Sequence, residues 1–310
     1  MRRGAPALSG RYIPPVADRT LTVVSADGAR LHTEVYGPQD APAVVLSHGW
    51  TCSTAFWAAQ VRDLAAGHRV IVYDQRGHGR SPLPADTGGY SARALADDLE
   101  AVLDATLEPG RRAVVVGHSM GGMTIMAAAG RPAVREHAAA VLLCSTGHER
   151  LVAEARVIPL RAGRLRDRLT RAVLASRAPL GPVTPLSRRL LRYGTMGRGA
   201  TPEMVDVCAR IVHACPRRAR CGWAGLFEGL DLTERVRALD VPTAVVVGRS
   251  DRLTPAVLGR GIAACVPDCA GLTELPGIGH MTPIEAPDEI TRRIRELSAE
   301  YVGAEGAASA

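Results

Sequence analysis

Short apolar runs alternate with amphipathic segments along most of this chain. The first two runs, Thr20–Ser25 and Arg30–Tyr36, alternate apolar and polar residues around Asp27-Gly28, which predicts a two-stranded hairpin. The later runs are mostly apolar and β-branched, as expected of strands that are buried on both faces. They are Ala43–Leu46, Arg69–Tyr73, Val114–Val116, Ala139–Leu143, Thr243–Val247 and Gly271–Leu275.

Longer segments with helical periodicity separate these runs. In Ser91–Leu107, for example, Leu95, Leu99, Val102 and Leu103 recur on one face. Strands that alternate with helices are typical of an α/β protein with a doubly wound, mostly parallel sheet. The other helices predicted in this alternation are Thr54–Ala65, Gly122–Ala129, Pro255–Cys265 and Pro287–Tyr301.

The alternation stops between residues 146 and 239. This segment is helical in pattern, rich in arginine, and interrupted by Pro179, Pro182 and Pro185. Roughly ninety residues are too many for a loop inside a compact domain. We therefore interpret 146–239 as a helical cap inserted into a core made of residues 20–145 and 240–302.

The two ends of the chain lack the pattern of the core. Residues 1–19 contain Pro6, Pro14 and Pro15, so we expect a flexible arm without regular structure. Residues 303–310 are small, and we expect a disordered tail.

One predicted cap helix has a charged side and an apolar side. Arginines at 161, 164, 168 and 171 recur at helical spacing, and Leu165, Leu169 and Val173 lie on the opposite side. A solvated arginine face over an apolar underside explains this pattern. A helix that rests on anionic lipid or contacts an acidic substrate explains it as well, so peripheral membrane contact through the cap stays open.

A second apolar group in the cap is a candidate for the substrate pocket. Trp223, Leu226, Phe227 and Leu230 follow the spacing i, i+3, i+4 and i+7, so they share one helical face. They either pack the interior of the cap or line an apolar path to the site. We take Trp223 and Phe227 as candidate pocket residues.

Charge and composition narrow the possible partners. The 310 residues have a formal net charge of +7, and every basic residue is arginine. No nucleic-acid recognition motif accompanies this charge, so we expect no nucleic-acid partner. The longest apolar run, Ala138–Cys144, is too short to cross a bilayer, and residues 4–15 lack the apolar stretch of a signal peptide. We expect a cytoplasmic protein without a transmembrane segment.

The seven cysteines do not indicate a metal site. Cys208, Cys215 and Cys221 lie near one another in the sequence, as do Cys265 and Cys269, but no pair has the C-x-x-C spacing typical of zinc ligands. We expect reduced thiols that pack as small apolar side chains, and no bound metal.

The stretch Ala113–Gly130 carries the clearest chemical signal. It has the pattern of a buried strand, a turn at residues 117–121 (GHSMG) and a helix, the setting in which G-x-S-x-G presents a nucleophilic serine. Glycine suits the second residue on either side of the serine, since a side chain there would collide with the neighbouring strand or helix. We therefore predict Ser119 as a nucleophile, with the Met120 N–H at the start of the helix, where negative charge is stabilised.

A serine hydroxyl needs a base within reach, and the base needs an acid that orients it. In a parallel sheet, residues that follow the carboxyl ends of strands meet at one edge. Asp251 follows the predicted strand Thr243–Val247, and His280 follows the strand that ends at Leu275. We predict Asp251 as the acid and His280 as the base. Asp251 could instead cap the helix that begins near Pro255.

These segments resemble the α/β-hydrolase family in its capped, single-domain form. The matching segments, in order, are HGW at 48–50, DQRGHGRS at 74–81, GHSMGG at 117–122, VPTAVVVGRSDRLTP at 241–255 and GIGHM at 277–281. The resemblance covers residues 20–145 and 240–300, and the cap carries no resemblance that can be assigned.

The resemblance implies a role for each matching residue. Ser119 would be the nucleophile, His280 the general base and then the general acid, and Asp251 the group that sets the His280 tautomer. The backbone N–H groups of Trp50 and Met120 would form the oxyanion hole, and the Trp50 side chain would line the pocket. The resemblance implies no metal and no organic cofactor.

We therefore predict a lipase-like serine esterase that cleaves a carboxylic ester of a mainly apolar small molecule. The same three residues also serve thioesterases, C–C bond hydrolases, perhydrolases (cofactor-free haloperoxidases) and cyclising biosynthetic enzymes of the family, so these reactions stay open, as does a non-catalytic ligand-binding role. Some members place the acid after an earlier strand, which makes Glu149 an alternative to Asp251. Epoxide hydrolases and haloalkane dehalogenases of this fold use aspartate at the position of Ser119, which argues against both.

Overall fold

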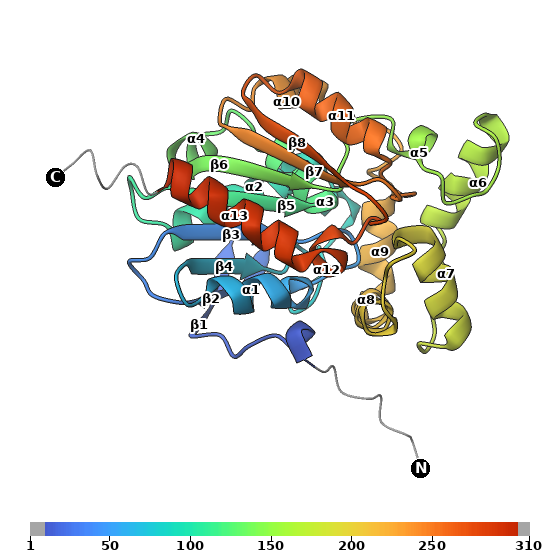
Figure 1. The fold of residues 1–310 in the computed structure, drawn as a ribbon, viewed down its shortest axis with the longest axis horizontal. Coiled ribbons are helices and arrows are strands. Elements are labelled where there is room, and N and C mark those ends of the chain that lie inside the picture. The colour runs from blue at the N-terminus through green and yellow to red at the C-terminus, as the bar shows by residue number, and fades with distance from the viewer. Residues whose placement is uncertain (1–9, 303–310) are drawn as a thin grey trace, which may run out of the picture.

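Eight strands form a single sheet at the centre of the molecule (Figure 1). The computed structural model describes residues 10–302, and its strands follow the order β1-β2-β4-β3-β5-β6-β7-β8. β1 pairs antiparallel with β2, and β2 pairs antiparallel with β4, whereas all other neighbours are parallel. The strands are β1 (Arg19–Val24), β2 (Arg30–Tyr36), β3 (Ala43–Ser47), β4 (Arg69–Tyr73), β5 (Ala113–His118), β6 (Ala138–Cys144), β7 (Thr243–Gly248) and β8 (Cys269–Leu275).

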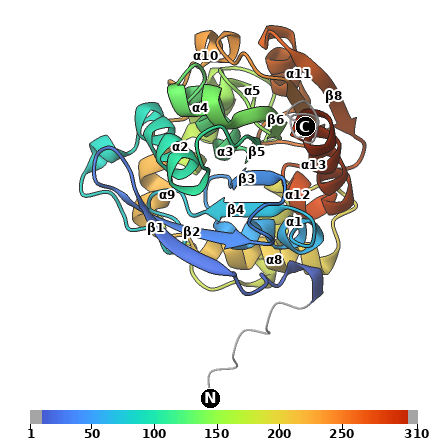
Figure 2. The same ribbon diagram turned by 90° about the vertical axis from the view of Figure 1, so that its left-hand side faces the viewer.

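Helices cover both faces of this sheet, which confirms the predicted fold class. Figure 2 shows α2 on one side of β3 and β4, and α1 on the other. The helices of the core are α1 (Ala58–Leu64), α2 (Ala92–Thr106), α3 (Met120–Ala127), α4 (Pro132–His137), α11 (Ala256–Cys265), α12 (Thr282–Glu285) and α13 (Pro287–Tyr301). Short 3-10 helices lie at η1 (Gly10–Tyr12), η2 (Thr54–Trp57) and η3 (Thr87–Gly89).

The apolar core is divided into two layers by the sheet. On β3, Val45 packs with α2 and α3, whereas its neighbours Val44 and Leu46 pack with α1 and α13. Successive side chains on a strand point to opposite faces, so a central strand must be apolar throughout to fill both layers. This requirement explains the continuous apolar runs in the sequence.

Two expectations near the N-terminus need correction. The predicted helix over residues 54–65 is helical as far as Leu64, but its first turn is the 3-10 helix η2, which runs directly into α1. The arm 1–19 contains regular structure, since η1 packs against the core, where Tyr12 is buried and its hydroxyl donates to the Ile284 carbonyl at 2.9 Å. The expectations for residues 1–9 and 303–310 lie outside the described residues.

Six helices occupy the segment between β6 and β7. They are α5 (Leu151–Glu154), α6 (Arg164–Leu174), α7 (Pro185–Thr195), α8 (Pro202–Ala214), α9 (Arg217–Ala224) and α10 (Thr233–Arg237). In Figure 1, α6 and α7 form the edge of the molecule opposite the C-terminus. The last part of the segment belongs to the core, because Val236 on α10 and Leu239 after it are buried in the same apolar layer as α2 and α3.

Helix α6 contradicts the expectation of an apolar underside. Leu165, Leu169 and Val173 are exposed to solvent, whereas Arg166 and Thr170 are the buried residues of this helix. The Arg166 guanidinium donates to the Ala153 carbonyl on α5, which explains how a basic side chain is accommodated on the inner side.

Candidate active site

The turn after β5 holds Ser119 in a strained backbone conformation. Its φ is 52° and ψ is −117°, and few L-residues adopt such angles without support from the surrounding structure. The support includes hydrogen bonds from the Ser119 N–H to Cys144 O (3.0 Å) and from the Thr146 hydroxyl to Ser119 O (2.7 Å). A Cβ added at Gly121 would lie 2.1 Å from the Ser47 carbonyl oxygen. Glycine is therefore required where the pattern predicts it.

The structure brings Asp251 and His280 into direct contact. Asp251 Oδ2 lies 2.8 Å from His280 Nδ1, and both side chains are buried. The other carboxylate oxygen accepts the Leu253 and Thr254 N–H groups, each at 2.8 Å. Asp251 therefore does orient the loop before α11, as a cap would, and it also contacts the histidine. A carboxylate on Nδ1 leaves Nε2 as the ring nitrogen that can accept a proton.

The sequence patterns did not single out Thr254, which joins this pair. Its hydroxyl lies 2.8 Å from Asp251 Oδ2, 2.9 Å from the Ser145 carbonyl and 3.0 Å from His280 Nδ1. Thr254 is buried. Its hydroxyl therefore helps to hold the Asp251 carboxylate and the His280 imidazole together and ties them to the loop after β6.

Glu285 is a second residue that the sequence patterns did not reveal. Its buried carboxylate accepts backbone N–H groups from Gly197 (2.7 Å), Gly279 (3.0 Å) and Met281 (3.1 Å). Burial raises the pKa of Glu285, and these three donors act in the opposite direction. The His280 N–H also donates to the Thr195 carbonyl at 2.7 Å. The base of the cap and the histidine loop are thus joined through one carboxylate and one backbone bond.

The Ser119 hydroxyl faces a small apolar cavity. Within residues 10–302 no group forms a hydrogen bond with Ser119 Oγ. The cavity has a volume of about 30 Å³, which is room for one or two water molecules. Its lining is almost entirely apolar and comes from both the core and the cap: Trp50, Met123, Leu151, Ala155, Leu174, Phe227, Leu253 and Thr254.

Two backbone N–H groups beside Ser119 are free to bind an anion. Neither the Trp50 nor the Met120 N–H donates a hydrogen bond to any residue that the structure describes. Met120 is the first residue of α3, so its N–H also lies at the positive end of the helix dipole. These are the two groups that the sequence comparison with α/β-hydrolases assigns to the oxyanion hole.

Buried histidines hold the loop that carries Trp50. The Thr51 N–H donates to His78 Nε2 at 3.2 Å, and the Gln75 N–H donates to His48 Nε2 at 3.0 Å. Burial lowers the pKa of His48 to about 4 and that of His78 to about 3. Both rings are therefore neutral acceptors near neutral pH. They fix the Trp50 loop to the DQRGHG loop that follows β4.

His118 supports the backbone of His280. His118 Nε2 donates to the His280 carbonyl at 2.9 Å, and the two ring centroids are 4.9 Å apart. Burial lowers the pKa of His118 well below its ordinary value. Glu149, the alternative acid, does not contact His280: its nearest basic group is His148 Nε2 at 3.9 Å, and it lines a different hollow with Arg150 and Asp231.

The two aromatic candidates for the pocket separate in the structure. Phe227 lines the Ser119 cavity and contacts Trp50 edge to face, with 5.4 Å between the ring centroids. The expectation for Trp223 is wrong, because this residue does not line the cavity. It is completely buried and donates its indole N–H to the Arg76 carbonyl at 3.1 Å. Helical spacing places both residues on one face but does not tell which neighbour each one meets.

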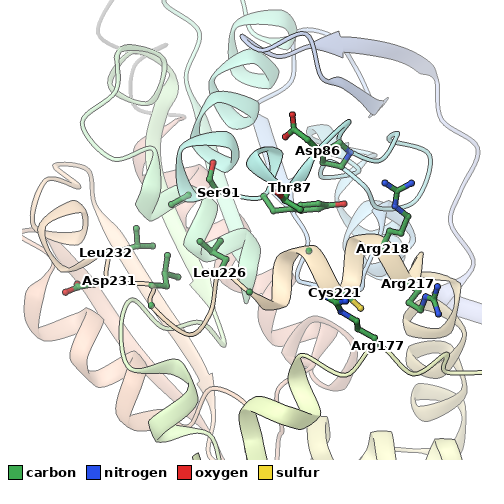
Figure 3. A pocket seen from close by; sticks show the side chains of 17 residues that line it. Asp86, Thr87, Ser91, Arg177, Arg217, Arg218, Cys221, Leu226, Asp231 and Leu232 are labelled. Carbon is green, nitrogen blue, oxygen red and sulfur yellow. The ribbon is translucent and has the colours of Figure 1, made fainter. Parts of the chain in front are cut away.

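A larger, open hollow lies elsewhere, between α9 and the loop before α2 (Figure 3). Its volume is about 980 Å³, and it shares no lining residue with the Ser119 cavity. Figure 3 shows Arg177, Arg217 and Arg218 at one end and Leu226 and Leu232 toward the other. Because Ser119, His280, Trp50 and Met120 all lie outside it, the larger hollow is not the candidate site.

Comparisons with known proteins identify the family of this chain. Residues 44–293 match the model of the alpha/beta hydrolase family. The chain is 34% identical over 253 residues to a putative carbamate hydrolase, RutD, of Variovorax paradoxus, covering 81% of this chain and 89% of that protein. It is 28% identical to a bifunctional esterase/perhydrolase, DCH, of Acinetobacter calcoaceticus, covering 87% and 96%. A thermophilic esterase structure from Thermogutta terrifontis aligns with a TM-score of 0.72 at 25% identity, covering 90% and 97%. The chain belongs to the alpha/beta hydrolase family.

Proposed function

We propose that this protein is a serine hydrolase that cleaves carboxylic esters of mainly apolar small molecules through an acyl-enzyme intermediate. The observation that carries the proposal is the convergence of three features at one edge of the sheet. Ser119 faces an apolar cavity from a strained turn, Asp251 is bonded to His280 Nδ1, and the Trp50 and Met120 N–H groups lack partners among residues 10–302.

In the first half of the reaction, His280 Nε2 takes the Ser119 proton as Oγ attacks the ester carbonyl. The carbonyl oxygen becomes an oxyanion that the Trp50 and Met120 N–H groups stabilise. Asp251 keeps the proton on Nδ1 and stabilises the imidazolium. His280 then gives the proton to the leaving alcohol, and the acyl group stays on Ser119. In the second half, His280 activates water, and the acid is released by the same steps.

The lining of the cavity supports an apolar acyl or alcohol group. Trp50, Met123, Leu151, Leu174 and Phe227 offer carbon surface and no charge. The present cavity is smaller than any ester, so the cap side chains that close it must move aside when substrate enters. We expect affinity to rise with chain length until the substrate fills the space that this movement opens.

The first test is covalent labelling. A fluorophosphonate probe should label Ser119 in the purified protein, and Ser119→Ala should lose both labelling and activity, with kcat reduced by roughly 10⁶-fold. Ser145→Ala is a matched control, because Ser145 is also buried and follows the neighbouring strand β6. It should keep the label. Labelling that survives in Ser119→Ala would exclude Ser119 as the nucleophile.

The second test is a panel of p-nitrophenyl esters of graded chain length, extended to carbamates and to peracid formation. The carbamate arm follows from the similarity to the putative carbamate hydrolase RutD, and the peroxide arm from the similarity to the esterase/perhydrolase DCH. In perhydrolysis, hydrogen peroxide replaces water: it attacks the carbonyl carbon of the acyl group, the bond to Ser119 Oγ breaks, Ser119 regains its proton from His280, and the peracid is released. Activity on carbamates alone, or on none of these substrates, would contradict the ester assignment.

A further inference from the structure

Helix α6 presents an apolar stripe that none of the described residues covers. Leu165, Leu169 and Val173 follow the spacing i, i+4 and i+8, and they are between 39% and 65% exposed. The residues one position later, Arg166, Thr170 and Leu174, form the inner side of the helix. The residues one position earlier include the exposed Arg164 and Arg168. Each step of one residue turns 100°, so an arginine stripe, an apolar stripe and an inner stripe run side by side.

Helix α7 repeats the same order of stripes. Leu186 and Leu190 are 66% and 62% exposed, at the spacing i and i+4. The residue before Leu190 is the exposed Arg189, and the residue after it, Leu191, packs inward against the core. Tyr193 is also exposed on this side of α7. Two separate helices thus carry exposed leucine beside exposed arginine, at the edge of the molecule opposite the C-terminus (Figure 1).

The charge of the protein is concentrated in the same segment. Residues 146–239 contain 18 arginines and 8 acidic residues, a formal net charge of +10, whereas the whole chain carries +7. The side chains of Arg161, Arg164, Arg168 and Arg189 form no ion pair with any residue between 10 and 302. These guanidinium groups are therefore available to an anionic partner, next to leucines that are available to an apolar one.

We propose that α6 and α7 form a docking surface for an anionic lipid bilayer. A bilayer offers both features at once, since acyl chains would receive the leucine stripes and lipid phosphates would lie level with the arginines. No described helix is long and apolar enough to cross a membrane, so the contact is peripheral. A folded protein partner would need matching acidic and apolar stripes in register, whereas a fluid lipid surface adapts to the spacing that the helices present.

Helix α6 contributes to both the docking surface and the Ser119 cavity. Leu174, on the inner stripe of α6, lines the Ser119 cavity, while Leu165 and Leu169 of the same helix face solvent. A membrane-bound α6 would therefore contact the lipid through its outer side and the cavity through its inner side. The docking proposal itself does not depend on the chemistry at Ser119, so the two can be tested separately.

The experiment is flotation of the full-length protein with vesicles of phosphatidylglycerol or phosphatidylcholine at 0.1 M salt. We expect binding to phosphatidylglycerol, at least tenfold weaker binding to phosphatidylcholine, and loss of most binding at 0.5 M salt. Ser119→Ala protein should bind as the wild type does. Hydrolysis of a soluble short-chain ester, measured in parallel, tells whether a failure concerns docking or catalysis.

Two sets of variants locate the surface. The double variants Leu165→Glu/Leu169→Glu and Leu186→Glu/Leu190→Glu should each weaken binding at least tenfold. Val16→Glu/Val24→Glu adds the same charge at exposed positions outside the cap and should bind almost normally, apart from the added charge. Arg161→Gln/Arg164→Gln/Arg168→Gln should weaken binding by roughly 100-fold. The matched control is Arg19→Gln/Arg30→Gln/Arg235→Gln, which removes the same charge at exposed positions outside the docking surface.

Three outcomes would overturn the proposal. One is no binding to phosphatidylglycerol at 0.1 M salt. Another is vesicle binding that falls equally in the cap variants and in their controls, because net charge alone would then account for the binding. The third is a dimer, measured by light scattering, that Leu165→Glu/Leu169→Glu converts to a monomer in the absence of any vesicle binding. In that case the stripes would be the contact between two copies of the chain.

Discussion

The sheet core and the cap use the same residue types in opposite ways. In the core, aliphatic side chains such as Leu99 on α2 and Ile294 on α13 are completely buried, whereas Leu165 on α6 and Leu186 on α7 are about two-thirds exposed. Residues 146–239 carry a net charge of +10, which leaves −3 for the rest of the chain. The core buries its aliphatic side chains, whereas α6 and α7 expose part of theirs to solvent. Asp251 and His280 come from the core, whereas the cap supplies the Thr195 carbonyl that accepts the His280 N–H and part of the lining of the Ser119 cavity.

The largest expected effect concerns the acid of the core. Asp251→Asn should reduce kcat by roughly 10⁴-fold while KM changes little, because an amide favours the wrong tautomer of His280. Steady-state kinetics on an ester found in the panel would measure this. Glu149→Gln is the matched control on the cap side and should leave kcat within a few-fold. If Glu149→Gln were the more damaging change, the assignment of the acid to the core would be wrong.

Variants of Trp223 test whether this cap residue stabilises the fold, as core residues do, or lines the substrate pocket. We expect Trp223→Ala to lower the free energy of unfolding by about 3–5 kcal/mol, since it removes a completely buried ring and the hydrogen bond to Arg76. Phe227→Ala, at the wall of the Ser119 cavity, should change KM for long-chain esters more than Trp223→Phe does. Urea unfolding and kinetics distinguish the two. If Trp223→Ala were stable and had an altered chain-length preference, Trp223 would be a pocket residue.

The buried histidines of the core predict a loss of stability on acidification. Burial lowers the pKa of His78 to about 3 in the folded protein, below the ordinary value of 6.5. The unfolded chain therefore binds a proton first, and the free energy of unfolding falls as pH falls below 6.5. His78 should account for about 2 kcal/mol of this loss between pH 7 and pH 5. Urea titrations of wild type and His78→Asn at both pH values should show a smaller loss in the variant, and an equal loss would count against this origin.

The smallest expected effect is on stability, and it directly compares an exposed leucine of the cap with a buried leucine of the core. Leu165→Ala, on the exposed stripe of α6, should change the free energy of unfolding by no more than about 0.5 kcal/mol. Leu99→Ala, an identical change on the buried face of α2, should cost about 2–5 kcal/mol. A large cost at Leu165 would mean that this stripe is covered within the protein, which would also remove the basis of the lipid-docking surface.

Much of the core could be predicted because local pattern and global position are linked there. A parallel sheet must bury both faces, so its strands are marked by continuous apolar runs, and β3 to β7 follow those runs closely. Side chains after the carboxyl ends of such strands meet at one edge. This rule brought Ser119, Asp251 and His280 together as candidates before any contact was known, and the 2.8 Å contact of Asp251 with His280 agrees with it.

The sequence by itself therefore determined the sheet, the order of its strands along the chain and the candidate reacting groups. Only the tertiary structure decided which side of α6 faces inward, because helical periodicity separates stripes without saying what packs on each. It also decided the roles of Thr254 and Glu285. Glu285 binds Gly197, 88 positions away in the sequence, and no local pattern records a partner at that distance. Residues that act through distant contacts become visible only when the chain has folded.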